Sequence, residues 1–319
     1  MTLDTYPFSS VLLVTFNRPD YTRQVLDRLR ECKVPKLYIF NDGPRENNPN
    51  DREARNRIRE LLAGINWDCE LKTLFSENNL GCGLGVSSAI TWAFTNEDRL
   101  IILEDDCVPS PAFFPYCNNL LERYREDTRI WLISGENHDY PPEAFKDGDY
   151  IFSQFGFNCG WATWRRCWDH LDMSMACLEE FLEGGHLRDV FCQREIVKGY
   201  YKRYSRLKEQ MGDKPRFWTA QFGFQVVSNR GYFIIPRENL IENIGEVGDH
   251  TVRASKYNYV KSSDDFMVCR HPRFVLPDHG VDLKHFKARI KPRIQGKPLG
   301  ARILNKVSKI VRGICKLPV

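Results

Sequence analysis

The first hundred residues alternate between short apolar runs and segments in which apolar residues recur at helical spacing. Strands are expected at the apolar runs 10–16, 36–40 and 100–103, and a further strand at 70–75. The helical segments between them lie at residues 21–31, 52–62 and 84–94. Continuous apolar runs are typical of buried parallel strands, and strands that alternate with helices indicate an α/β fold. The pattern therefore predicts a mixed, mostly parallel sheet flanked by helices.

The pattern changes further along the chain. A helix at 112–124 and a strand at 130–134 are followed by an aromatic stretch at 152–168. Helices are expected at 178–210, a late strand at 232–236 and a loop at 243–251. Beyond about residue 270 proline, glycine and basic residues become frequent, which marks a boundary. We therefore expect one α/β domain over 1–270 and a basic extension over 271–319.

Composition supports a chain that folds on its own inside the cell. The 319 residues are 42% hydrophobic, enough for one large core. The 11 cysteines are odd in number and contain no CxxC pair, so we expect them to be reduced. The N-terminal residues lack a basic region before their apolar run, and no run approaches 18 apolar residues. These features predict a cytoplasmic protein without a signal peptide or membrane span.

Charge is distributed unevenly along the chain. Residues 1–282 hold 35 Lys and Arg against 42 Asp and Glu, whereas the remainder holds 11 basic residues and no acid. Within the extension, apolar and basic positions fall on opposite faces of a helix expected at about 301–316. Such a helix can lie on an anionic membrane surface, or it can pack back onto the acidic body. An acidic body without a basic, aromatic-laced stripe argues against nucleic-acid binding.

Three consecutive acids, Glu104, Asp105 and Asp106, follow the apolar run at 100–103. Polar residues also follow the first two strands, at Asn17 and Asp42, and the carboxyl ends of parallel strands are where such sheets bind ligands. Adjacent carboxylates repel one another, and a divalent cation relieves that repulsion. Mg²⁺ and Mn²⁺ prefer one or two carboxylates together with phosphate oxygens and water. A metal and diphosphate site is one interpretation, and an acidic surface turn is the other.

Five segments in this order resemble GT-A fold glycosyltransferases. They are VLLVTFNRP, NDGPR, ENNLGCGLGVSSA, LIILEDDCVPSPAFFPYCNNLLERY with RIWLISGEN, and FGFNCGWATWRRCW. The chain is similar to inverting N-acetylglucosaminyltransferases of the type that starts complex N-glycans, and to a family 2-like group of bacterial nucleotide-diphospho-sugar transferases. The resemblance covers about residues 8–280. It implies a nucleotide-binding half at 1–135 and an acceptor-side half at 136–270.

The resemblance also implies roles for individual residues. Asp106, in a DXD-like position, would bind Mn²⁺ or Mg²⁺, with His250 of a late loop over the metal and diphosphate. Asp105 would contact the ribose and the donor sugar, and Glu104 would support these contacts. The other implied residues of the donor site are Thr15, Asn17, Arg18, Asp42, Asn79 and Gly81, and those of the acceptor side are Gly160 and Trp161. Asp42 also suits a turn, and Trp161 and His250 also suit structural positions.

An inverting transfer needs a general base that takes the proton of the acceptor hydroxyl. The bacterial relatives place an Asp in a W-D-Y-Q-type segment, but Thr219 stands at that position here. Threonine is not a base at neutral pH, so Asp213 is the expected base and Glu136 its alternative. The departure also keeps open a degenerate protein that binds a nucleotide sugar or glycan without turnover.

The implied activity is transfer of a hexosyl or N-acetylhexosaminyl group from a UDP-linked donor to a surface-glycan or lipid-linked acceptor. This activity belongs to polysaccharide biosynthesis, and the basic extension suits a peripheral position on the inner face of the membrane. A nucleotidyltransferase shares the sheet and the metal. It needs a glycine- and basic-rich loop after the first strand, and TFNRPDYT is not such a loop.

Overall fold

The computed structural model describes residues 8–138, 140–210, 218–245 and 259–295. Its centre is an eight-stranded sheet with the order β3-β2-β1-β4-β8-β6-β9-β7. The first four strands in the chain are β1 (Val11–Thr15), β2 (Lys36–Asn41), β3 (Glu70–Phe75) and β4 (Arg99–Glu104). The other four are β6 (Ile130–Ser134), β7 (Tyr150–Ser153), β8 (Trp161–Trp164) and β9 (Tyr232–Pro236). Every residue of β1 and β6 is buried, as their unbroken apolar sequences predict.

Strand direction confirms the predicted mixed, mostly parallel sheet. β1, β2, β3 and β4 pair in parallel, and β9 pairs with β6 in parallel. β8 runs against both β4 and β6, and β7 runs against β9. Because β8 is reversed, its first residue lies beside the end of β4, with Trp161 opposite Ile102. The loop that precedes β8 therefore reaches the same edge of the sheet as the acidic triplet.

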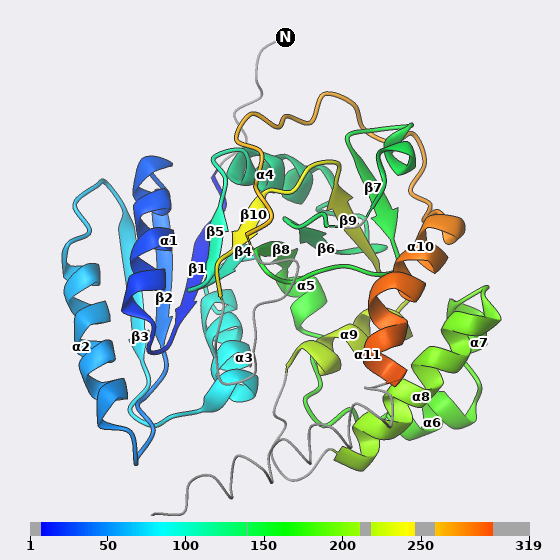
Figure 1. The fold of residues 1–319 in the computed structure, drawn as a ribbon, viewed down its shortest axis with the longest axis horizontal. Coiled ribbons are helices and arrows are strands. Elements are labelled where there is room, and N and C mark those ends of the chain that lie inside the picture. Colours follow the sequence, from blue (N-terminus) through cyan, green and yellow to red (C-terminus); the bar gives the residue numbers. More distant parts are fainter. Residues whose placement is uncertain (1–7, 139, 211–217, 246–258, 296–319) are drawn as a thin grey trace, which may run out of the picture.

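Helices flank the sheet in both halves of the chain. In the first half they are α1 (Pro19–Glu31), α2 (Pro49–Ala63), α3 (Gly81–Phe94) and α4 (Phe113–Arg123). α1 begins with Pro19, which suits the first turn of a helix because no hydrogen-bond donor is needed there. Its buried side chains include Val25, Leu26 and Leu29, at the spacing of one helical face. Figure 1 shows α1 and α2 at one side of the molecule, next to β1, β2 and β3.

The second half contains the 17-residue helix α8 and several shorter helices. They are η1 (Pro142–Phe145), α5 (Arg165–Trp168), α6 (Leu178–Glu183), α7 (Leu187–Val190), α8 (Arg194–Gln210), α9 (Thr219–Ser228), α10 (His279–His285), η2 (Phe286–Ile290) and α11 (Lys291–Gln295). Most of them gather at the side opposite α1 and α2 (Figure 1). They share a second apolar core in which Tyr200 and Tyr204 of α8 pack with Phe286 and Ile294. Residues 279–295, at the start of the predicted extension, are thus integrated into the fold.

A small antiparallel sheet stands beside the main one. It joins β5 (Cys107–Pro109) to β10 (Ile241–Asn243), and Asn243 lies opposite Cys107. Because β5 begins directly after Asp106, β10 brings a segment from late in the chain to the acidic triplet. Within the described residues, every helix is too short or too polar to cross a bilayer.

Candidate functional site

The acidic triplet lies at the carboxyl-terminal edge of the central strands. Glu104 is the last residue of β4 and is opposite Val14 of β1, while Thr15 is opposite Asn41 at the end of β2. The ends of three parallel strands therefore bring Thr15, Asn41 and Glu104 together. This is the arrangement expected from the apolar runs and the polar residues that follow each of them.

Arg18 contacts two of the three acids. It stands just before α1, where its Nη1 donates to Asp106 Oδ2 at 2.9 Å and its Nη2 donates to Asp105 Oδ1. The two carboxylates favour the charged guanidinium and raise the pKa of Arg18 against the opposing effect of burial. The ion pair partly neutralises the triplet in the described structure.

Burial and mutual repulsion make the first two acids hard to ionise. Burial, followed by the charges of Asp106 and Asp105, raises the pKa of Glu104 to about 8. Burial also raises the pKa of Asp105 to about 6, although Arg18 acts in the other direction. Both groups are therefore protonated more easily than ordinary carboxylic acids, and added positive charge would favour their ionised forms.

Two observations bear on whether a metal and a nucleotide sugar fit here. Asp105 is 2% exposed, and its Oδ2 has no hydrogen-bond partner among the described residues. A buried acceptor of this kind is costly unless a ligand hydroxyl or amide donates to it. The described residues contain no group of three His, Cys, Asp or Glu able to hold a metal. An ion held by Asp106 together with phosphate oxygens and water fits this donor set, whereas a fully protein-ligated ion does not.

Gly245 closes one side of Asp106. The Ile244 backbone N–H donates to the Asp106 carbonyl at 2.9 Å, which fixes this approach. A Cβ atom at Gly245 would overlap Asp106 Oδ2, so the close approach requires glycine. The glycine lies in the late NIGEVGDHT segment, but its contact with Asp106 depends on the pairing of β10 with β5. The spacing along the sequence gave no signal of it.

A polar cavity of about 600 Å³ adjoins Arg18. Its walls come from the β1–α1 connection and from the start of α2, including Asn17, Asp51 and Arg57. Asn17 Nδ2 donates to Asp51 Oδ1 at 2.8 Å, and Arg45 Nε donates to Asp51 Oδ2 at 2.6 Å. The hydrogen bond from Arg45 is the main reason that the pKa of Asp51 is lowered. Asp51 and Arg45 were not among the predicted site residues.

Asp42 and its neighbours form a tight loop. Asp42 Oδ1 accepts from the backbone N–H groups of Gly43 and Leu80 at 2.8 and 2.9 Å. Its Oδ2 accepts from Gly81 N at 2.9 Å and from Asn79 Nδ2 at 3.2 Å. Burial raises the pKa of Asp42, and these backbone hydrogen bonds oppose the increase. Asp42 therefore has the structural role that its turn sequence offered, and Asn79 and Gly81 are its partners; contact with a base stays a prediction.

Thr15 also has internal partners. Its Oγ1 donates to the Phe40 carbonyl at 3.0 Å and accepts from Asn41 Nδ2 at 3.0 Å. These two hydrogen bonds connect β1 to β2, and Thr15 is 2% exposed. The hydroxyl joins the two strand ends beneath the site.

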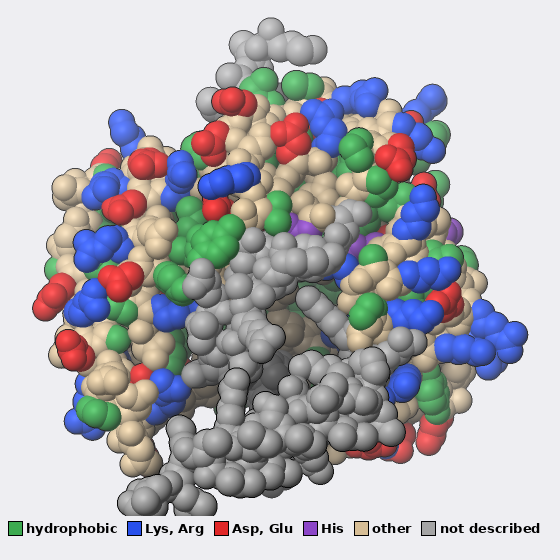
Figure 2. All heavy atoms as spheres, viewed as in Figure 1, with side chains coloured by type: hydrophobic (Ala, Val, Ile, Leu, Met, Phe, Trp, Pro, Cys, Tyr) green, Lys and Arg blue, Asp and Glu red, His purple; other side chains and the backbone are tan. Residues whose placement is uncertain are grey.

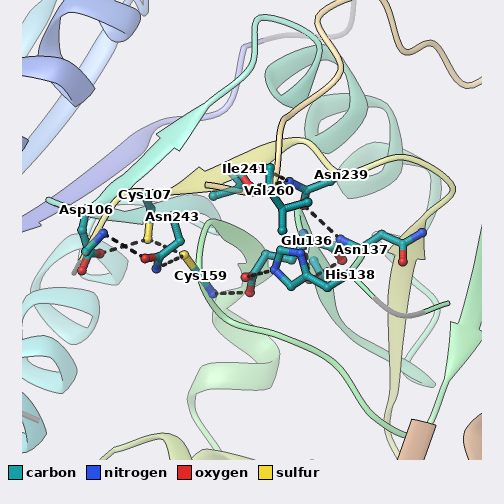
Figure 3. A network of polar contacts seen from close by, with 12 residues as sticks. Asp106, Cys107, Glu136, Asn137, His138, Cys159, Asn239, Ile241, Asn243 and Val260 are labelled. Carbon is teal, nitrogen blue, oxygen red and sulfur yellow. Dashed lines mark hydrogen bonds and ion pairs between the residues drawn. The ribbon is translucent and has the colours of Figure 1, made fainter. Parts of the chain in front are cut away.

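Glu136 is connected to the triplet through a chain of polar contacts. It follows β6, its Oε1 lies 2.6 Å from His138 Nε2, and its Oε2 accepts from Cys159 N at 3.3 Å. Cys159 Sγ lies 2.7 Å from Cys107 Sγ and accepts from Asn243 Nδ2 at 3.1 Å. Figure 3 shows these side chains extending from Asp106 toward Glu136 and His138.

The same contacts place Glu136 near the acids. It is 8% exposed, and its charge contributes to the raised pKa of Glu104. Glu136 was expected as an alternative base, whereas His138 was not among the expected site residues, although the two lie only two positions apart in GENHD. The pairing with Cys159 and Asn243 depends on tertiary structure.

Trp161 lies in the core and not on an acceptor-side wall. It is 1% exposed, and its ring stacks on Trp218 with centroids 5.4 Å apart and an angle of 16°. The expectation that it presents a face to a sugar is therefore corrected, because a large apolar ring at the start of a central strand is buried by the helices that cover it. Gly160 has φ +64°, and a Cβ atom there would overlap Ile241.

Several predictions fall on residues outside the described ranges. These are the base at Asp213, the metal contact at His250 and the amphipathic helix at about 301–316. Thr219 is described, is exposed and is the first residue of α9. Of the two expected bases, only Glu136 lies in the described residues, and its role as a base stays a prediction.

Comparisons with known proteins do not assign the chain to a family. No family model matches the chain. No curated protein matches it either. A solved structure of UDP-glucose pyrophosphorylase complexed with UDP-glucose aligns with 52% of this chain and 79% of that chain, at 10% identity and a TM-score of 0.32. A match this weak carries no functional information.

Proposed function

We propose that the protein is an inverting, metal-dependent glycosyltransferase that uses a nucleotide-diphosphate sugar, with UDP as the expected nucleotide. The observation that supports this most is the edge of β4, where Asp105 and Asp106 meet Arg18 beside a polar cavity of about 600 Å³. Carboxylates, an arginine and a buried acceptor without a partner are the groups needed to hold a diphosphate and the hydroxyls of a ribose or sugar.

Each residue has a distinct part in this proposal. Asp106 would hold Mn²⁺ or Mg²⁺, which when bound supplies positive charge for the diphosphate leaving group. Asp105 would accept a hydroxyl hydrogen through Oδ2, and Glu104 would support it from the strand end. Arg18 would exchange part of its ion pair with Asp106 for a contact with the diphosphate, because bidentate arginine suits phosphate oxygens.

Glu136 is the proposed base. It would take the proton of the acceptor hydroxyl as the oxygen bonds to the anomeric carbon, and the bond from that carbon to the diphosphate oxygen breaks. His138 Nε2, 2.6 Å from Glu136 Oε1, would orient the carboxylate. Asp213, the base expected from the sequence, lies outside the described residues and becomes the alternative here.

The acceptor is proposed to be a surface glycan or a lipid-linked sugar, in keeping with the basic extension. The test is a thermal-shift panel of UDP, GDP, UDP-sugars and UTP on the full chain, with and without Mn²⁺. Stabilisation by UDP or UDP-sugars only when Mn²⁺ is present supports the transferase. A preference for triphosphates would instead support a nucleotidyltransferase, and no response to any nucleotide would contradict both.

Two variants separate binding from turnover. Asp106→Asn should weaken Mn²⁺-dependent nucleotide binding by about a hundredfold, since even indirect partners of metals contribute about 10–100-fold. Asp68→Asn, an exposed acid on another surface, is its matched control. Glu136→Gln should retain nucleotide binding and lose turnover of the donor. Full activity of Glu136→Gln would remove this residue from the mechanism.

A further inference from the structure

A second cavity, of about 210 Å³, lies on the other side of the core from the polar one. It is enclosed by residues 154–158 between β7 and β8, by α8, by the start of α9 and by η2. Seven Phe, Tyr and Trp side chains contribute to its wall: Phe155, Phe157, Tyr200, Tyr204, Trp218, Phe222 and Phe233. A small, aromatic cavity of this size suits one ring-sized ligand with apolar faces.

Gln154 gives the cavity a buried acceptor. The side chain is 8% exposed, and its Nε2 donates to the Val190 carbonyl at 2.9 Å. Its Oε1 has no partner among the described residues. Because Nε2 is held by a carbonyl, the amide cannot be reversed to remove the orphan, and a buried acceptor is costly when nothing donates to it. A ligand hydroxyl would satisfy Oε1.

The charged groups of this cavity are positive. Arg203 and Arg289 contribute to its wall, and none of the described residues that line it is Asp or Glu. The Arg289 guanidinium lies 4.5 Å from the centroid of Phe157, and that of Arg203 lies 5.8 Å from the centroid of Tyr200. Two arginines that pack on aromatic rings in the cavity wall favour a ligand that carries an anionic group.

The cavity is continuous in the chain with the candidate active site. Residues 154–158 border the cavity, and the next residue, Cys159, contacts Glu136 and Cys107. Thr219 also lines the cavity, next to Trp218. The wall of the cavity is therefore joined, through one short connection, to a residue that contacts Glu136.

We infer that this cavity binds a sugar ring that carries an anionic group, with the ring against the aromatic wall, a hydroxyl on Gln154 Oε1 and the anion on the arginines. The inference that an anionic sugar binds here depends on the cavity alone. Its role as the acceptor site rests on the proposed transferase, so that the acceptor would be an acidic glycan.

The test measures binding of small probes to the full chain by saturation-transfer NMR titration. Glucuronate, glucose 6-phosphate, glucose and inorganic phosphate are compared, so that ring, carboxylate and phosphate are separated. One or both acidic sugars should bind about tenfold or more tightly than glucose, because one charged hydrogen bond accounts for about that factor. Whichever of the two binds more tightly identifies the anion. Equal binding of glucose and both acidic sugars would contradict the anionic part of the inference.

Variants locate the probe. Arg203→Gln, on the exposed side of α8, should weaken binding of the acidic sugar about tenfold. Lys202→Gln, its exposed neighbour outside the cavity wall, is the matched control and should leave binding unchanged. Gln154→Leu should weaken glucose and acidic sugars alike, because it removes a hydroxyl acceptor. Unchanged affinity in both Arg203→Gln and Gln154→Leu would overturn the site.

A separate readout distinguishes this inference from the proposed function. Asp106→Asn should weaken Mn²⁺-dependent nucleotide binding by about a hundredfold and leave binding of the acidic sugar unchanged. Failure of nucleotide binding in the unmodified protein would contradict the transferase but not the cavity. Binding of nucleotide without binding of any sugar probe would contradict the cavity alone.

Discussion

The two cavities are built in different ways. The polar cavity is formed by the β1–α1 connection and the starts of α1 and α2, within residues that are close together in the chain. The aromatic cavity draws on β6, the loop before β8, α8, α9 and η2, which lie far apart in the chain. Charged groups dominate the first and aromatic rings the second, which suits a diphosphate in one and a sugar ring in the other.

This difference explains which features could be predicted from the sequence. The strands β1, β2 and β4 have apolar runs that are typical of buried parallel strands, so the edge holding Glu104, Asp105 and Asp106 could be predicted from the chain alone. Arg18 could also be placed there, because it follows β1 directly. Its ion pairs with Asp105 and Asp106 required the parallel pairing of β1 with β4.

The second region has no comparable signal. β8 is four residues of WATW within an aromatic stretch, and nothing in that sequence tells a central reversed strand from an exposed aromatic wall. Trp161 was therefore placed on the acceptor side although it is buried. Gln154, Arg203 and Arg289 meet only after α8 and η2 have packed together, so the aromatic cavity was not predicted.

The largest expected effect belongs to Asp282, beneath the aromatic cavity. It is 1% exposed and accepts from Ser153 Oγ at 2.5 Å and from Gln154 N at 3.0 Å. Burial raises its pKa from 3.8 to about 7, so the folded state retains a proton that the unfolded chain loses. Its contribution to stability is present at pH 4 and is lost as the pH rises toward about 7.

Asp282→Asn should remove that pH dependence. Between pH 4 and pH 8 the free energy of unfolding of the unmodified protein should fall more than that of the variant, on the order of 4 kcal/mol. Urea unfolding at several pH values measures it, with Asp68→Asn as the control. Parallel curves for the unmodified protein and Asp282→Asn would show that Asp282 titrates as an ordinary acid.

Gly160→Ala should disturb the junction between the two regions. The backbone there has φ +64°, and the added Cβ overlaps Ile241 of β10. The positive φ and the overpacking together should lower the free energy of unfolding by about 3 kcal/mol. Chemical denaturation measures the loss, and a variant as stable as the unmodified chain would contradict the described packing of β8 against β10.

Gly245→Ala should affect only the polar region. The methyl group would displace Asp106 Oδ2, so Mn²⁺-dependent nucleotide binding should weaken about tenfold, by analogy with the loss of a metal's supporting contact. Binding of an acidic sugar should stay the same. Calorimetry with UDP and Mn²⁺ measures the first, and unchanged nucleotide affinity would separate Gly245 from the metal site.

Gly223→Ala should have the smallest effect, and in the opposite direction. Gly223 lies inside α9, and a Cβ atom there would meet nothing within 4 Å. Alanine in a helix interior is favoured over glycine by about 0.5–1 kcal/mol, so the variant should be slightly more stable. A decrease in melting temperature would mean that the wall of the aromatic cavity is more crowded than described.

The charged side chains on the surface also differ between the two regions. Figure 2 shows basic and acidic side chains intermixed at the side of the molecule formed by α1 and α2, and blue groups concentrated at the opposite side. An acidic glycan would approach the second side against less repulsion, which weakens with added salt.

The reversal of β8 has a consequence for altering this protein. Because β7 and β8 are both part of the sheet, residues 154–160 form a short connection anchored at its two ends by strand pairing. This connection borders the aromatic cavity, whereas the polar cavity is lined by other residues of the chain. Libraries confined to residues 154–158 can therefore search for new ligands of the aromatic cavity without altering the polar cavity, in the way that antibody loops are varied on a constant framework.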